Sequence, residues 1–336
     1  MKTRNALAAT GAAAVLLALI GKTVIVLIMI GIMLGIMLDS VAEAGQRLLG
    51  LNRRASVIMA AMLSVCLFAG LALLLAVPLF QQAALLSQSL FNGLAHLSET
   101  IRQDYPWLMQ IIPLPDEHDQ LAPQISKAGT AKAAVVSAAT LVEWIADVIA
   151  IFFLGLFIAW DPRRSVHGVV GLWRKEARPR VLRLVMSIIS AVRSYLFTLM
   201  VYIVAMAMMW TIGLWLIGLD YALVFGVLGG LAEIVPYIGP LIALIPPLLF
   251  SIPLGTATML WVVLLYIILH IVEGYILVPY VLHRKEHLPA PLVVLSILVF
   301  GAIFGPLGVI VALPAGLICY VLVQELIYER READGR

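Results

Sequence analysis

The chain has 336 residues, of which 63% are hydrophobic and 12% carry a charge, against about 45–50% and about 25% in soluble domains. A soluble protein of this size needs far more polar surface, which excludes a soluble enzyme, a disulfide scaffold, a disordered regulator and a coiled coil. The formal net charge of +3 is spread unevenly, and the long apolar segments predict a polytopic α-helical membrane protein.

Residues 1–80 are predicted to form N-terminal transmembrane helices. A crossing needs about 20 apolar residues. Ala6–Ile20 is short for a crossing and leads directly into a second apolar run, Thr23–Leu38, so we expect a two-helix hairpin with Lys22 at its tip. A signal peptide is the alternative, but no Ala-x-Ala cleavage site follows. A third apolar run, Ala55–Phe80, predicts the next crossing.

Charge indicates how the chain is oriented. The polar segment 81–140 is mainly acidic and is divided by prolines, which predicts short amphipathic helices, whereas residues 161–194 are strongly basic. Cytoplasmic loops carry an excess of Lys and Arg, so the basic segment is expected in the cytoplasm and the acidic segment outside. A transmembrane helix at 141–160 joins them. Both termini, including the tail 328–336, are then expected in the cytoplasm, and the basic segment is a topology signal rather than a nucleic-acid site.

The C-terminal region, 195–327, is predicted to be the transmembrane core. Two apolar stretches in it, 222–252 and 291–323, are interrupted by Gly and Pro. Each half of 222–252, with about 14 residues, is too short to cross a bilayer, and a full crossing by each interrupted pair is the alternative. Interrupted backbone at membrane depth must be covered by protein or line a water-filled cavity, so both stretches are predicted re-entrant hairpins. The expected fold is therefore an all-α polytopic membrane protein with six to eight transmembrane helices, two of these hairpins included.

The two interrupted stretches also resemble each other. Each contains Gly-Pro-Leu, starting at Gly239 in the first and at Gly305 in the second. Paired interruptions of this kind indicate the binding site of a secondary transporter. A chance recurrence is the alternative, because the chain contains 25 Gly and 17 Pro.

Ionisable residues within apolar segments are the candidate functional residues, because a charge in lipid costs about 2.5–3.5 kcal/mol. Glu233 lies three residues before Pro236, where the first hairpin is interrupted. His270 and Glu273 are three residues apart and share a helix face. A His–carboxylate pair can change its charge near neutral pH, although a purely structural hydrogen bond between helices is an equal alternative.

Several further residues are assigned a role or a location from the sequence pattern alone. Glu143 and Asp147 lie four apart near the outer end of the 141–160 helix and indicate either a solvated entrance or a proton site. Trp210 and Trp215 are expected in an interfacial belt. No Walker loop, HExxH motif, Cys pair or nucleophile elbow occurs, so we expect no enzyme activity, no metal and no cofactor.

The segment Gly230–Pro240, followed by Pro246, resembles the signature of the autoinducer-2 exporter family of PerM-like permeases. Further matches are Val272–Pro279 and the region from Leu288 to Pro314. The resemblance covers nearly the whole chain and is most specific after residue 220. Where the family usually has Asn, two residues after the Glu that matches Glu273, this chain has Tyr275, a departure that bears on the substrate more than on the fold.

The resemblance implies a multi-pass protein of the bacterial inner membrane that forms homo-oligomers, with a pentamer as the expected form, and moves small molecules outward. We therefore expect a secondary transporter that couples proton entry to export of a small polar molecule such as a quorum-sensing signal. A sodium/proton antiporter is the alternative, followed by a non-transporting structural or assembly protein or a passive oligomeric pore. The expected partners are membrane lipids, the solute, and H⁺ or Na⁺. The residues expected along the pathway are Glu233, Pro236, Tyr237, Gly239, Pro240, His270, Glu273, Tyr275, Gly305 and Gly308, with Glu143 and Asp147 at its entrance.

Overall fold

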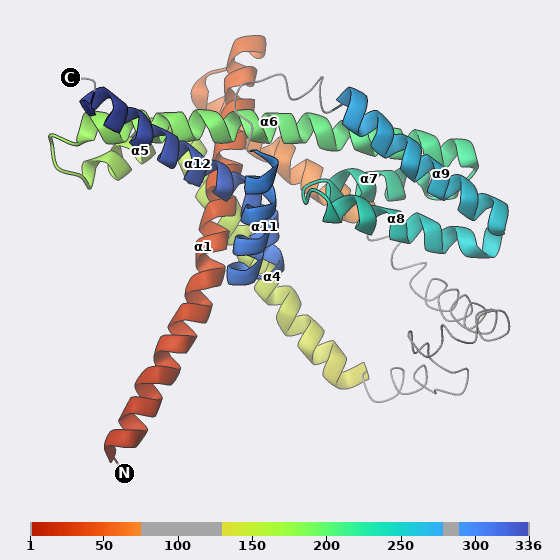
Figure 1. Ribbon diagram of the computed structural model, residues 1–336, viewed down its shortest axis with the longest axis horizontal. Helices are drawn as coiled ribbons and strands as arrows, with labels where there is room; N and C mark the ends of the chain where they lie inside the picture. Colours follow the sequence, from red (N-terminus) through yellow and green to blue (C-terminus); the bar gives the residue numbers. More distant parts are fainter. Residues whose placement is uncertain (1, 75–129, 278–288, 335–336) are drawn as a thin grey trace. The chain divides into compact units, whose positions relative to one another are not determined.

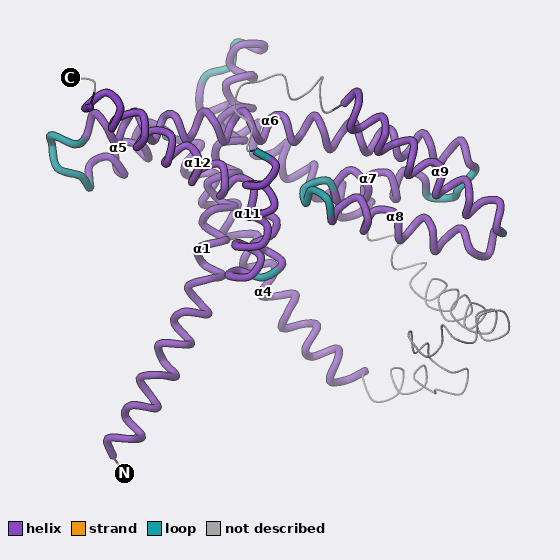
Figure 2. Tube along the Cα trace, in the orientation of Figure 1, coloured by secondary structure: helices purple, strands orange, loops and turns teal. Residues whose placement is uncertain are grey.

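The computed structural model describes the backbone of residues 2–74, 130–277 and 289–334. It describes side chains for 21–74, 142–252, 254–277 and 289–325. The described backbone is helical and contains no strand (Figure 2). Six helices are long and apolar enough to cross a membrane: Gly21–Leu49, Arg53–Leu74, Val142–Trp160, Arg178–Ile217, Thr256–Leu277 and Pro306–Glu325. The chain therefore has the all-α polytopic architecture predicted from its composition.

The N-terminal helix differs from the prediction. α1 (Lys2–Leu49) is one continuous helix, so the hairpin with Lys22 at its tip was wrong (Figure 1). A lone Gly within a helix costs only about 1 kcal/mol relative to Ala, and a lone Lys can extend its side chain away from apolar surroundings. Gly21-Lys22 is thus compatible with an uninterrupted helix. The expected side of the N-terminus depended on that hairpin, because one helix in place of two removes a crossing.

The described helices belong to two compact units, and the first combines Met1–Cys66, Ile145–Leu199 and Arg284–Arg336. In this unit α1 packs against α4 (Thr130–Trp160) through glycines on both helices. A Cβ added at Gly155 would lie 3.1 Å from the backbone nitrogen of Gly35, so only small residues allow this approach. Most of the predicted 81–140 segment lies outside the described residues.

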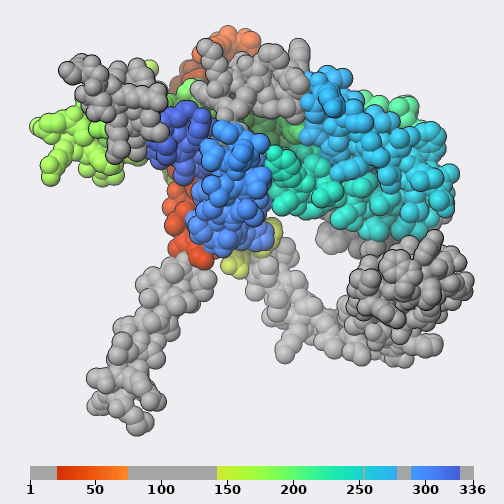
Figure 3. Space-filling model, viewed as in Figure 1, coloured from red at the N-terminus to blue at the C-terminus, as the bar shows by residue number. Residues whose placement is uncertain are grey.

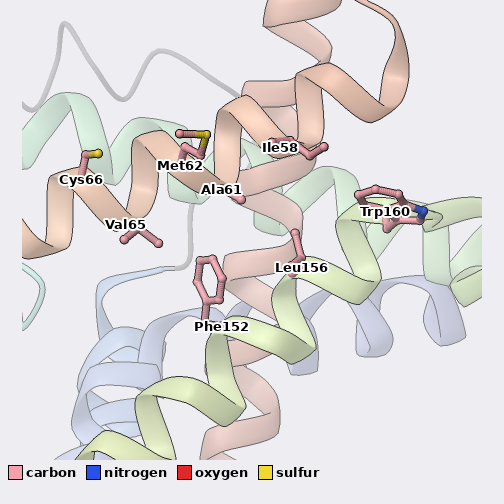
Figure 4. A pocket seen from close by; sticks show the side chains of 8 residues that line it. All are labelled: Ile58, Ala61, Met62, Val65, Cys66, Phe152, Leu156 and Trp160. Atoms are coloured by element: carbon pink, nitrogen blue, oxygen red, sulfur yellow. The ribbon is translucent and has the colours of Figure 1, made fainter.

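An apolar groove of about 350 Å³ lies in the first unit between the helix Arg53–Leu74 and α4 (Figure 4). Met62 and Cys66 line one side, and Phe152 and Trp160 line the other. Its lining contains no charged side chain. This surface suits contact with lipid or with another helix and offers nothing to orient a polar solute.

The first unit also contains a helical hairpin, α11 (Ala290–Phe304) and α12 (Pro306–Asp334), whose helices lie side by side (Figure 1). Gly305 forms the turn with φ +70°, a conformation that favours glycine. A Cβ on Gly308 would lie 2.1 Å from the carbonyl oxygen of Phe300, so this glycine lets α12 pack directly on α11. The remaining helices of this unit are α5 (Pro162–Gly171) and the first part of α6 (Arg178–Ile217).

The second unit combines Leu67–Trp144 and Met200–His283. The later part of α6 is followed by α7 (Ala222–Ala232), α8 (Ile238–Ser251), the short turn η2 (Ile252–Leu254) and α9 (Thr256–Val272). A π-helical turn, η3 (Glu273–Leu277), continues α9. The contiguous surface of α8 and α9 is seen in Figure 3.

Trp210 of α6 lies at the centre of the second unit. It is fully buried, with Met206, Leu214 and Val262 around it, so its expected place in an interfacial belt was wrong. Glycines of α7 make this packing possible. A Cβ at Gly230 would lie 2.5 Å from the carbonyl oxygen of Ile203 on α6.

Candidate functional site: a buried Glu–His–Glu cluster

Three ionisable side chains predicted from separate positions meet in the second unit. Glu233 follows the last residue of α7, His270 lies in the last turn of α9, and Glu273 begins the π-helical turn η3. One potential ligand atom from each residue lies within 4.8 Å of the other two. We call these three residues the carboxylate–histidine cluster.

Glu273 is held by hydrogen bonds on both of its oxygens. The hydroxyl of Tyr202 on α6 donates to Oε1, and the Nδ1–H of His270 donates to Oε2. His270 in turn packs edge-on against the ring of Tyr266, with the ring centroids 4.3 Å apart. The second carboxylate is therefore fixed in position from two helices.

Two other polar atoms of the cluster lack a partner. Oε1 of Glu233 and Nε2 of His270 are buried and make no hydrogen bond, and Glu233 as a whole is only 3% exposed. Buried polar atoms are normally hydrogen-bonded, and each such exception calls for a physical explanation. Because Nδ1 of His270 carries the donated hydrogen, a neutral ring leaves a free lone pair on Nε2. The cluster therefore presents an unused oxygen and an unused nitrogen to whatever it binds.

Neither lysine nor arginine occurs in the part of the sequence that supplies the cluster. Between Arg193 and Arg284 the sequence contains neither Lys nor Arg. An isolated buried carboxylate pays a desolvation penalty of several kcal/mol unless a cation or a proton neutralises it. His270 can offset one carboxylate at most, so the cluster as a whole favours a bound cation or added protons.

The backbone at Glu233 explains why one carboxylate is free. α7 ends here, and the chain turns back through Tyr237, which has a positive φ of 67°. A Cβ on Gly239 would lie only 1.9 Å from the carbonyl oxygen of Ala232, so the turn is closed by direct contact of backbone with backbone. Unsatisfied carbonyl groups gather at the C-terminal end of a helix and favour positive charge.

The other predicted site residues are not in the cluster. Pro236 and Tyr237 lie in the turn between α7 and α8, Gly239 and Pro240 lie in the first turn of α8, and Tyr237 is exposed. Tyr275 is 82% exposed on η3. Gly305 and Gly308 belong to the other unit, where they form the α11–α12 turn. Glu143 is exposed and Asp147 half-buried on α4.

Tyr202 is the cluster residue that sequence reasoning missed. A tyrosine within a transmembrane segment carries no charge and is common near membrane interfaces, so its pattern gave no signal. Its hydrogen bond to Glu273 depends on how α6 packs against α9.

A second polar cluster, also missed, lies in the first unit. Asp39 of α1 is 6% exposed and pairs with Arg53 at 2.6 Å and with Arg193 at 2.5 Å. Arg193 also pairs with Glu43 at 3.0 Å, and Arg53 donates to the carbonyl oxygen of Ala159 at the end of α4. Arg193 belongs to the basic segment 161–194, which is interpreted from the sequence as a topology signal only. A cavity of about 730 Å³ lies beside Asp39 and Arg193.

Six apolar helices of membrane-crossing length, with a partly buried polar cluster in one of the two units, define a polytopic α-helical membrane protein. The particular family follows from comparison with known proteins. The model of the AI-2E family transporter matches residues 7–327, and the chain belongs to this family.

Individual relatives match over shorter lengths. The chain is similar to YrrI of Bacillus subtilis (strain 168), with 26% identity over 61% of this chain and 58% of the relative. It is also similar to YhhT of Escherichia coli (strain K12), with 32% identity over 34% of this chain and 33% of the relative. Both are described provisionally as transport proteins. The aligned part thus spans about a third to somewhat over half of these relatives.

Proposed function

We propose that the protein is a secondary transporter that uses the proton gradient to export a small polar molecule, with the carboxylate–histidine cluster as its coupling site. The observation that carries the proposal is the pair of carboxylates, buried Glu233 and half-buried Glu273, in a stretch without Lys or Arg. Such groups are stable only when protonated or paired with a cation. Coupling of ion movement to transport requires a site that binds a cation in one conformational state and releases it in another.

The interrupted helix supports the same interpretation. Half-helix ends at membrane depth are the usual place where secondary transporters bind ions, because unpaired carbonyl groups there attract positive charge. Glu233 lies at such an end, directly after α7. We further propose that the stretch 222–252 is re-entrant, because α7 and α8 have only 11 and 14 residues and a crossing needs about 20. In 291–323 we propose that α11, with 15 residues, enters the membrane without crossing it, whereas Pro306–Glu325 of α12 is long enough to cross.

The cargo and the assembly are part of the proposal. The cargo is a small polar molecule, for which a quorum-sensing signal is the model compound by resemblance to the family. We propose that the protein is a homo-oligomer, pentameric by the same resemblance, in a bacterial inner membrane. The basic segment 161–194 and the C-terminus lie in the cytoplasm by the charge rule.

A sodium/proton antiporter is the second candidate, because the same two carboxylates would bind Na⁺ or Li⁺ in competition with protons. Proteoliposomes that enclose a pH-sensitive dye separate the candidates. An antiporter answers added Na⁺ or Li⁺ with proton movement, whereas a proton-coupled exporter answers the quorum-sensing signal and not the salts. Conductance without any proton movement would indicate a passive pore, and no response to either would contradict transport by this cluster.

A further inference from the structure

The unpartnered atoms of the carboxylate–histidine cluster have the chemistry of a metal site. Nε2 of His270 is a buried nitrogen with a free lone pair, and Oε1 of Glu233 is a buried carboxylate oxygen without a donor. Glu233 is 97% buried, so water does not readily take the place of a missing partner. A cation between them would satisfy both atoms at once.

The contact between His270 and Glu273 is the arrangement that prepares a histidine for metal binding. A ligating histidine usually donates its other ring N–H to a carboxylate, which fixes the tautomer, orients the ring and makes the free nitrogen more basic. Here Nδ1–H of His270 donates to Glu273, and Glu273 is itself held by Tyr202. The free nitrogen is therefore Nε2, the one that has no partner.

The mixture of donors selects the kind of cation. Na⁺, Mg²⁺ and Ca²⁺ prefer sites made of several oxygens, whereas imidazole together with carboxylate suits first-row divalent ions such as Zn²⁺. Two carboxylates also balance a charge of +2. Neither Lys nor Arg occurs between Arg193 and Arg284 to compete for them.

The distances allow an ion to enter with small adjustments. A carboxylate oxygen of Glu233 lies within 4.8 Å of a ring nitrogen of His270. Around tetrahedral zinc, with bonds of about 2.0 Å, ligand atoms lie about 3.3 Å apart, so these atoms need to approach by at most about 1.5 Å. Glu233 lies at a turn, where a side chain moves more easily than within a helix.

We propose that His270 Nε2 and Glu233 bind a first-row divalent cation such as Zn²⁺, with Glu273 and Tyr202 as positioning residues. The site shares its residues with the proposed coupling site, so bound Zn²⁺ excludes protons from it and blocks transport. Glu273 on η3 and Tyr266 on α9 contact His270, and Tyr202 on α6 contacts Glu273.

The test is zinc binding by the purified full-length protein in detergent, freed of metal by dialysis against a chelator. Calorimetry should detect one high-affinity Zn²⁺ per chain, and Zn²⁺ should raise the thermal unfolding midpoint because it binds only the folded state. His270→Ala and Glu233→Gln should each lower the affinity at least about 100-fold. Glu273→Gln and Tyr202→Phe should lower it by a smaller factor, about 10-fold, as expected for positioning residues.

Matched controls are His167→Gln and Asp220→Asn, which alter an exposed histidine and an exposed carboxylate. Both should bind Zn²⁺ as the unaltered protein does. Equal binding by the unaltered protein and by the folded His270→Ala and Glu233→Gln variants would overturn the proposal, as would the absence of stoichiometric binding. These measurements need no gradient and no cargo. Zinc binding without proton-driven transport would therefore contradict the proposed function and support the metal site. Proton-driven transport without zinc binding would contradict the metal site and leave the proposed function standing.

Discussion

Tyr202 shows how one uncharged side chain can control a charged site. Its hydroxyl donates to the same carboxylate that accepts the Nδ1–H of His270. Both oxygens of Glu273 are thereby occupied, and the ring of His270 is held with Nε2 toward the interior. The position of the free nitrogen therefore depends on a residue of another helix.

Tyr202→Phe should slow transport about 10-fold without lowering the amount of folded protein. The variant removes one hydrogen bond to a charged acceptor, which contributes about 1.5–3 kcal/mol, and leaves the packing of the ring in place. Initial rates of flux in proteoliposomes measure the effect. Tyr221→Phe is the matched control, because its ring contacts Phe250 and lies outside the cluster. Equal rates for the two variants would show that the Tyr202 hydroxyl does not position Glu273.

At the scale of the helices, close contacts of backbone with backbone set where the apolar stretches are interrupted. The first turn of α8 and the first turn of α12 each contain a glycine that lies against a carbonyl oxygen, Gly239 against Ala232 and Gly308 against Phe300. The repeated Gly-Pro-Leu therefore marks two tight turns, one in each unit. The positions of the interruptions were predictable from Gly and Pro in the sequence. The contacts that these glycines make with carbonyl oxygens were not.

Gly239→Ala should destabilise the protein by at least about 1–3 kcal/mol, the usual cost of overpacking. The new methyl group would lie 1.9 Å from the carbonyl oxygen of Ala232, and a backbone atom cannot move aside as a side chain can. The apparent midpoint of thermal unfolding in detergent measures the loss. Gly168→Ala adds the same methyl group where no atom lies within 4 Å. Identical midpoints for both variants would mean that the turn after α7 tolerates a side chain.

Asp39 joins α1 to two arginines, and Asp39→Asn should lower stability by about 3–5 kcal/mol. Removing one partner of a buried ion pair leaves uncompensated charge: Arg53 loses its carboxylate partner, and Arg193 keeps only Glu43. Glu176→Gln, which alters an exposed carboxylate, is the control for the same thermal unfolding measurement. A midpoint for Asp39→Asn as high as that of the control would show that the pairs contribute little.

For the molecule as a whole, the charge rule predicts that residues 161–194 face the cytoplasm and Asp220 faces outward. In a variant without Cys66 and Cys319, a single cysteine at Asp220 should react with a membrane-impermeant maleimide on spheroplasts. A single cysteine at Arg174 should react only after the membrane is opened. Both are exposed positions in the described part of the chain. The reverse pattern of labelling would invert the proposed orientation.

Much of the fold and part of the site followed from the sequence, for identifiable reasons. Apolar composition determined the class, and ionisable residues in lipid are costly enough to single out Glu233, His270 and Glu273. That Glu233 meets the other two depends on the packing of α7 and α9, which no spacing encodes. Asp39 was overlooked because it stands at the end of an apolar run, next to a basic segment that topology alone explains. The hairpin at Lys22 was wrong because a single Gly-Lys pair does not end a helix.

The central claim, that the carboxylate–histidine cluster couples proton movement to transport, is tested most directly by proton flux into proteoliposomes. An imposed pH gradient should drive flux with the unaltered protein and with Asp220→Asn, whose carboxylate is exposed. Glu233→Gln and Glu273→Gln should abolish it, with folding verified by size-exclusion chromatography and thermal unfolding. Undiminished proton-driven flux in both glutamate variants would contradict the account.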